Sequence, residues 1–136
     1  YILANLIQVP SYISLMTALS YYEITTQVQQ DFIESIAVNR TKEVRVEQAV
    51  FNYTKINREL YFGFSKIKDF FIALPEKAFL DMMYLVSIHK YKFDRTSIEL
   101  DKLDAKRINR MAQKFPVKTQ KSIEDIYGKL KETRNI

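Results

Sequence analysis

The sequence contains no cysteine and no tryptophan, and only two glycines and three prolines among its 136 residues. Without cysteine the chain forms no disulfide framework, no thiolate zinc site and no cysteine nucleophile. Two glycines are too few for a glycine-rich phosphate loop of either common type. No apolar run reaches the roughly 18–20 residues of a membrane-spanning helix, and the first residues lack the basic-then-apolar order of a secretion signal. We therefore expect a soluble, cytoplasmic protein with no contact to a membrane.

The residues that are present favour one packed core and a basic surface. Hydrophobic residues make up 47% of the chain and aromatic residues 13%, which is ample for a core at this length. The formal net charge is +5, but the first 38 residues carry three acids and no base, whereas residues 94–136 carry eleven bases and seven acids. Such a surface suits phosphates or an acidic protein, although the outer faces of amphipathic helices are polar in any case.

The most hydrophobic stretch, residues 70–86, predicts a short strand followed by a buried helix. Pro75 suits the first turn of that helix, because its fixed φ is already helical and the amide it lacks would have no partner there. Apolar residues follow at helical spacing, at Phe79, Met82, Met83 and Val86. Three polar residues interrupt them, at Glu76, Lys77 and Asp81. The pattern predicts a central helix over residues 75–90, with Lys77 and Asp81 on one face.

The rest of the chain divides by the spacing of its apolar residues. Residues 1–31 predict a helical entry, with one helix ending before Pro10 and another capped by Ser14. Residues 32–74 alternate with a period of two and predict about five strands. Residues 97–132 return to helical spacing and predict the C-terminal helices.

The short connections between the expected strands favour antiparallel pairing as a meander, with a hairpin turn at residues 39–41. The second strand, over residues 42–47, alternates valine with charged residues and is typical of a sheet edge. Gly63 lies inside a strand pattern, which indicates a bulge or a close backbone approach. The expected fold is α+β, in one domain over residues 1–136: an antiparallel meander with flanking helices and a buried central helix after the last strand.

Candidate catalytic groups are few. His89 is the only histidine, and without a second histidine, a cysteine or an acidic cluster we expect no metal site and no cofactor. Ser11 and Ser14 are better explained as residues at the start of a helix than as nucleophiles. Glu76 and Lys77 are the residue types that a metal-dependent nuclease uses, a carboxylate for the ion and a lysine for the developing charge. Adjacent residues of a helix point about 100° apart, however, so the two side chains cannot readily converge on one ion. We therefore expect no catalytic residue and a protein that is not an enzyme.

Three stretches, in this order, resemble a known family: residues 4–24 (ANLIQVPSYISLMTALSYYEI), 51–64 (FNYTKINRELYFGF) and 72–85 (IALPEKAFLDMMYL). Together they are similar to the C-terminal domain of AbiEi-type antitoxins. That family is the antitoxin half of type IV toxin–antitoxin systems, which act in abortive infection, and its members are described as predicted transcriptional regulators of viral defence. The motif residues, which we interpret first as fold markers, are Pro10, Ser11, Tyr12, Ser14, Pro75, Glu76, Lys77 and Asp81. The chain departs from the family motif at Glu23, where the family has a glycine.

The resemblance implies a non-catalytic bacterial domain that acts by binding a protein or a nucleic acid. Family members usually carry an N-terminal winged helix-turn-helix that binds operator DNA, so we expect a DNA-binding module before Tyr1. Their C-terminal domain is implicated in neutralising a cognate nucleotidyltransferase-type toxin. From charge and expected exposure alone, the candidate surface for a toxin, DNA or RNA comprises Arg40, Lys42 and Arg45 on the edge strand and Arg107, Arg110 and Lys114 on the late helix.

Two other classes of function stay open from the residues. One is a metal-dependent nuclease-like domain, which the lack of a convergent acidic cluster disfavours. The other is a purely structural or dimerisation domain, which no feature of the sequence opposes.

Overall fold

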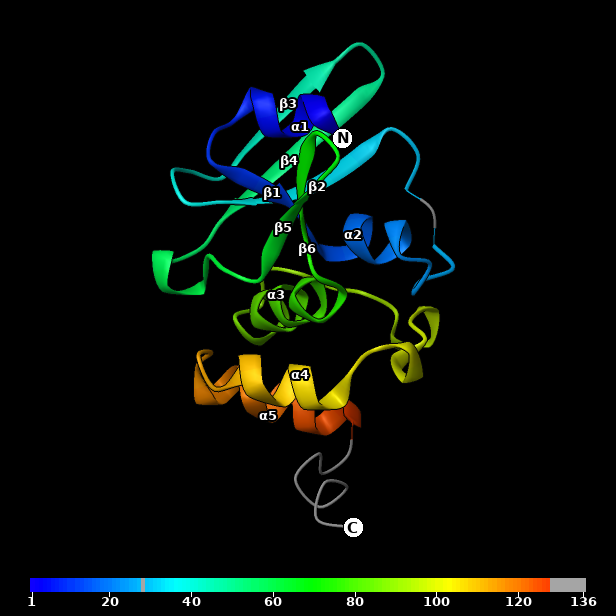
Figure 1. Ribbon diagram of the computed structural model, residues 1–136, viewed down its shortest axis with the longest axis vertical. Helices are drawn as coiled ribbons and strands as arrows, with labels where there is room; N and C mark the ends of the chain where they lie inside the picture. Colours follow the sequence, from blue (N-terminus) through cyan, green and yellow to red (C-terminus); the bar gives the residue numbers. More distant parts are fainter. Residues whose placement is uncertain (28, 128–136) are drawn as a thin grey trace.

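A six-stranded mixed sheet, with the N-terminal helix packed against it, forms one end of the α+β fold, and helices from the second half of the chain form the other end (Figure 1). This computed structural model describes residues 1–27 and 29–127. The helices are α1 (Ile2–Ile7), α2 (Leu15–Tyr21), α3 (Pro75–Ser87), α4 (Ala105–Ala112) and α5 (Val117–Tyr127). The strands are β1 (Ser11–Ile13), β2 (Phe32–Ala37), β3 (Lys42–Val46), β4 (Ala49–Lys55), β5 (Phe64–Ile67) and β6 (Phe70–Ala73). Short 3-10 helices cover Arg58–Leu60, Arg95–Ser97 and Leu100–Lys102.

The order of strands across the sheet is β3-β4-β2-β1-β6-β5, so the predicted antiparallel meander of five strands is wrong. β2 pairs with β4 in parallel, and β1 pairs with β6 in parallel. The turn at residues 39–41 therefore does not make a hairpin between β2 and β3. Phe51 and Tyr53 of β4 are buried, whereas β3 is largely exposed. The sheet therefore buries the most apolar surface when β4 lies inside it and β3 lies at its edge. The prediction of an edge strand at β3 is confirmed.

β1 is the second departure from the sequence prediction. Its three residues were expected to lead into a helix, but they form a fully buried strand between β2 and β6. Three residues are too few to show a period of two, so the pattern could not reveal them. The alternating pattern over residues 60–67 predicts a fourth strand, but a 3-10 helix ends at Leu60 and the strand begins only at Phe64.

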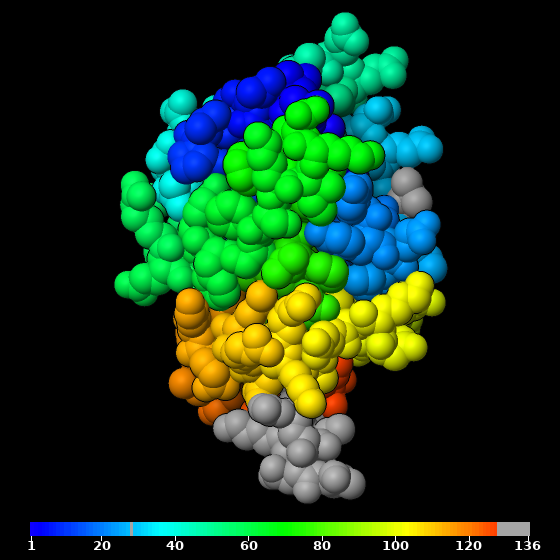
Figure 2. Space-filling view, in the orientation of Figure 1, coloured from blue at the N-terminus to red at the C-terminus, as the bar shows by residue number. Residues whose placement is uncertain are grey.

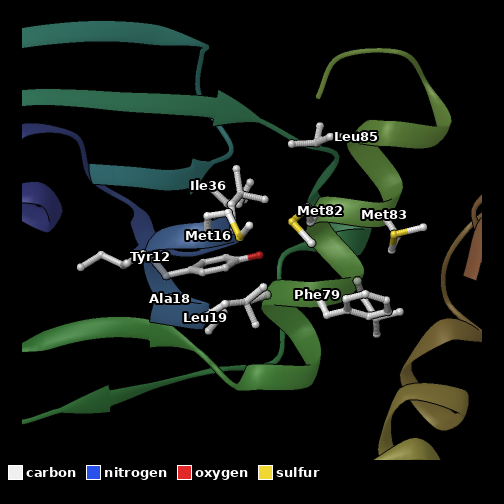
Figure 3. Packing of buried hydrophobic residues seen from close by; sticks show 14 of the residues in the cluster. Tyr12, Met16, Ala18, Leu19, Ile36, Phe79, Met82, Met83 and Leu85 are labelled. Atoms are coloured by element: carbon white, nitrogen blue, oxygen red, sulfur yellow. The ribbon is translucent and has the colours of Figure 1, made fainter. Parts of the chain in front are cut away.

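α3 is the predicted central helix, and it begins at Pro75 as expected. It contacts α2 and β6 on one side and α4 and α5 on the other, so nearly its whole circumference is buried. In Figure 3, Met82 points toward Met16 of α2, while Met83 points away toward the C-terminal helices. The helix ends at Ser87, three residues earlier than predicted, where His89 adopts a left-handed φ of 61°.

The C-terminal helices were expected over residues 97–132. α4 and α5 lie within this range, and residues 128–132 lie outside the described part of the chain. In Figure 1, α4 and α5 form the layer farthest from the sheet, with α3 between them and the strands. Within residues 1–27 and 29–127, no helix combines the length and the apolar character needed to cross a membrane.

Two tyrosines, the buried Tyr53 and the half-buried Tyr22, connect the N-terminal segments to the sheet. The Tyr53 hydroxyl donates to the carbonyl of Ala4 in α1, and the Tyr22 hydroxyl donates to the carbonyl of Ala73 at 2.7 Å. Burial raises the pKa of Tyr22 to about 12, and that of Tyr53 to about 12 as well. Both phenols therefore keep their protons in the folded protein at pH values where an exposed tyrosine, with a pKa of about 10, loses its proton.

These shifts predict a loss of stability at high pH. Because the folded pKa values lie above the unfolded ones, the folded state binds more protons between pH 10 and 12, and the free energy of unfolding falls as the pH rises through that window. Urea unfolding midpoints should stay level from pH 8 to about 9.5 and then decline. Tyr22→Phe should decline less steeply than the wild type, and equal slopes would contradict the prediction.

Candidate functional site

Lys77 and Asp81 form a fully buried ion pair one turn apart on α3. The Lys77 Nζ lies 2.6 Å from Oδ1 of Asp81, and both side chains are 1% exposed or less. Nζ also donates to the Tyr12 hydroxyl at 2.8 Å and to the carbonyl of Leu60 at 2.7 Å. An ammonium group has three protons, so each of them has an acceptor.

The Asp81 carboxylate also has a full set of hydrogen-bond partners. Its Oδ2 accepts from the Tyr12 hydroxyl at 2.7 Å and from the Ser14 hydroxyl at 2.8 Å. Ser14 occupies the N-cap position of α2 as predicted, but its hydroxyl makes no capping bond and serves Asp81 instead. A buried ion pair is tolerated only when its remaining hydrogen-bonding capacity is filled, and this pair meets that condition.

Aromatic rings and a glycine enclose the lysine. Nζ lies 4.7 Å from the ring centre of Phe62, 5.3 Å from that of Tyr12 and 5.6 Å from that of Phe115. Gly63 has a left-handed φ of 74°, and a Cβ there would lie 2.7 Å from Cγ of Lys77. The sequence left a bulge or a close backbone approach open at Gly63, and the structure shows a close approach, made by the Lys77 side chain just before β5.

Burial shifts the pKa of every titratable member of this network. It lowers the pKa of Lys77 and raises the pKa of Asp81, while the contact between the two groups opposes both shifts. Burial also raises the pKa of Tyr12 well above its usual value, and the neighbouring Asp81 raises it further. Three acceptors around Nζ and three donors around the carboxylate fit the charged forms of both groups.

The network holds elements together and has no open route to a substrate. Lys77 and Asp81 are 0% exposed, as is Tyr12 between them, so no molecule in solution reaches the charged groups in this conformation. The hydrogen bonds join α3 to β1 and to the segment before β5. They fix the rotation of a helix that is apolar on nearly every side and would otherwise have little to define its orientation.

The other motif residues also have partners within the fold. The buried Glu76 accepts from Nη1 of Arg107 at 3.2 Å and from the amide of Asp104 at 3.0 Å, which joins α3 to α4. The Ser11 hydroxyl donates to the carbonyl of Gln8 at 2.6 Å. Pro10 follows α1, and Pro75 begins α3. Glu76 and Lys77 thus point to different partners and do not converge on a common site.

The six candidate basic residues lie in two separate groups. Arg40, Lys42 and Arg45 lie on β3 or just before it, at the sheet end of the molecule, and Arg107, Arg110 and Lys114 lie on α4 or just after it, at the opposite end (Figure 1). Arg45 pairs with Glu43 at 3.3 Å, and Nζ of Lys114 lies 4.6 Å from the ring centre of Phe62. The structure therefore does not bring the six residues into one surface.

Two features escaped the sequence analysis. Glu34 on β2 is buried and accepts from the Tyr91 hydroxyl at 2.9 Å, and burial raises the pKa of Glu34. An acid on the apolar side of a strand pattern was the available signal, but nothing in the sequence indicated its partner 57 residues later. The second feature is an apolar pocket of about 370 Å³ between α1 and the β5–β6 hairpin, which forms only in the folded chain.

Among the residues that the structure describes, no three His, Asp or Glu side chains are close enough together to hold a metal ion. The chain matches no known family model, and neither a curated protein nor a solved structure gives a significant match.

Removing one member of the ion pair should be costly. Lys77→Met leaves the Asp81 carboxylate buried without its counter-ion, which should lower the free energy of unfolding by about 3–5 kcal/mol. The double variant Lys77→Met with Asp81→Asn removes both charges, retains an acceptor for Tyr12 and Ser14, and should be more stable than Lys77→Met alone. Urea unfolding measures all three proteins.

The matched control is Arg45→Ala, which breaks the exposed contact with Glu43 and should cost less than about 1 kcal/mol. If Lys77→Met cost no more than this control, the buried pair would not hold the fold as described.

Gly63 provides an independent test of the same packing. Gly63→Ala places a Cβ against the aliphatic part of the Lys77 side chain. It also forces alanine to adopt the left-handed φ, so the free energy of unfolding should fall by at least about 1–2 kcal/mol. Ser65→Ala, at an exposed position of β5, should change stability by less than about 0.5 kcal/mol. Thermal unfolding of the two variants gives the comparison, and equal melting temperatures would refute the close contact.

Proposed function

We propose that this chain is a non-catalytic binding domain of the AbiEi-type antitoxin class and acts through its surface on a partner of negative charge. One observation carries the proposal: the three stretches behind the resemblance meet at Lys77. Tyr12 and Ser14 come from the first stretch, Leu60 from the second, and Lys77 and Asp81 from the third.

This convergence supports a shared fold, because the residues that carry the resemblance do one joint structural task. The polar atoms of Tyr12, Ser14, Lys77 and Asp81 are used up in contacts within this network, which leaves binding to other side chains. The two basic groups, at β3 and at α4, are the candidates. A cationic surface attracts nucleic acid or an acidic protein face and raises the rate of encounter with either.

The first experiment measures binding of the chain to a nucleotidyltransferase-type protein encoded beside it, and to duplex DNA and RNA across a salt series. Nucleic-acid binding that depends on phosphate contacts should weaken linearly in log affinity with log salt. Binding to the toxin partner should accompany rescue of growth when the two proteins are produced together. Absence of binding to all three at low salt would overturn the proposal.

Charge reversal separates the two surfaces. Arg40→Glu with Lys42→Glu and Arg45→Glu tests the β3 group, and Arg110→Glu with Lys114→Glu tests the α4 group. Arg107 is left unchanged because it contacts the buried Glu76, and its loss would disturb the fold. We expect one set to weaken binding at least tenfold while the other has a small effect. Equal affinity for both sets and the wild type would contradict a charge-based surface.

A further inference from the structure

Seven of the nine exposed large hydrophobic residues in the described part of the chain lie in or near α1. Four aliphatic side chains in or next to this helix are 45–68% exposed, namely Ile2, Leu3, Leu6 and Val9. Phe71 of β6 is 40% exposed beside them, and Tyr1 and Tyr21 continue the area at 39% and 38%. Soluble monomers seldom leave a contiguous apolar patch of this kind open to water, so such a patch marks an interaction surface.

The same area is hollowed. The pocket of about 370 Å³ is lined by Ile2, Leu6 and Val9 on one side and by Tyr61, Phe64 and Phe71 on the other. Figure 2 shows the residues of α1 directly against those of the β5–β6 hairpin on the viewed face. The aromatic residues on the hairpin side pack on one another, with ring centres 4.9 Å apart for Tyr61 and Phe64 and 6.1 Å apart for Phe64 and Phe71. The walls of the pocket are therefore already formed.

We propose that a second copy of this chain covers this α1–hairpin face in a two-fold symmetric dimer. The area is the first argument. Seven large side chains that each expose on the order of 100 Å² offer roughly 700 Å², which approaches the ~800 Å² per partner of a standard stable interface. In a two-fold dimer the same patch serves on both subunits, so an apolar face can bury itself against its own copy.

Charge is the second argument, and it distinguishes a second copy from a charged partner. Lys66 and Asp69 both line the pocket, and none of the six candidate basic residues does. The lining of the pocket thus carries one base and one acid, which makes it complementary to itself: a two-fold axis can set Lys66 of one copy against Asp69 of the other, twice. A strongly acidic partner would find no net charge in the lining of this pocket. Lys66 also lies on the edge strand β5, where a lysine disfavours edge-to-edge strand pairing, so contact across the face is favoured.

Sedimentation equilibrium of the purified chain, without toxin or nucleic acid, tests the proposal. The wild type should be a dimer in reversible equilibrium with monomer. Leu6→Glu should raise the dimer dissociation constant at least tenfold, with circular dichroism and melting temperature showing that the chain stays folded. The matched control is Val117→Glu at the start of α5, because Val117 is 64% exposed and Leu6 68%. A monomeric wild type at high concentration, or equal dissociation constants for Leu6→Glu and Val117→Glu, would overturn the proposal.

A charge exchange tests the orientation of the two copies. Lys66→Asp places two acids on the face and Asp69→Lys places two bases, so each variant should dimerise at least tenfold more weakly than the wild type. A mixture of the two variants should form a heterodimer, since every crossed pair is then opposite in charge. Failure of the mixture to associate, or wild-type association of each variant alone, would refute this arrangement. These measurements use no toxin or nucleic acid. A negative result for the dimer therefore leaves the proposed function untouched, and a negative result for the proposed function leaves the dimer untouched.

Discussion

The buried pair of Lys77 and Asp81 is the interaction on which the rest of the structure depends. Two charges removed from water destabilise a protein unless each is fully matched, so the pair imposes strict demands on its neighbours. The Tyr12 hydroxyl must lie between the two charged groups, and the carbonyl of Leu60 must accept the remaining hydrogen bond of the Lys77 ammonium group. The lysine stem in turn leaves room only for glycine at position 63. One pair thus fixes the relative positions of β1, α3 and the segment that enters β5.

The pair also explains how so apolar a helix acquires a single orientation. α3 is buried against the sheet side on one face and against α4 and α5 on the other, and apolar packing alone would tolerate several rotations about its axis. Lys77 and Asp81 point toward β1, and Glu76 points to Arg107 and the start of α4. Polar contacts in two directions therefore align the layers that the hydrophobic effect brings together.

The sequence predicted what local physics decides. The start of α3 followed from Pro75, the edge character of β3 from its alternating charges, and the close approach at Gly63 from a glycine in a strand pattern. The order of strands did not follow, because the position of β4 between β3 and β2 depends on burial of Phe51 and Tyr53 in the assembled sheet. The spacing of Lys77 and Asp81 predicted a shared face, but their partners Tyr12 and Leu60 are distant in sequence and carried no local signal.

The burial of the motif residues separates the fold from its interactions. Tyr12, Lys77 and Asp81 are buried and offer no surface to a partner, so substitutions that alter binding without altering the fold must fall elsewhere. Among the described residues, three exposed regions are candidates for interaction: the bases at β3, the bases at α4, and the apolar face of α1. The two basic regions suit a charged partner, whose affinity falls as the salt concentration rises. Association through an apolar face is driven by the removal of apolar surface from water, and its affinity depends only weakly on salt. The same chain can therefore associate with itself through one region and with a charged partner through another, because the two contacts use different residues and different forces.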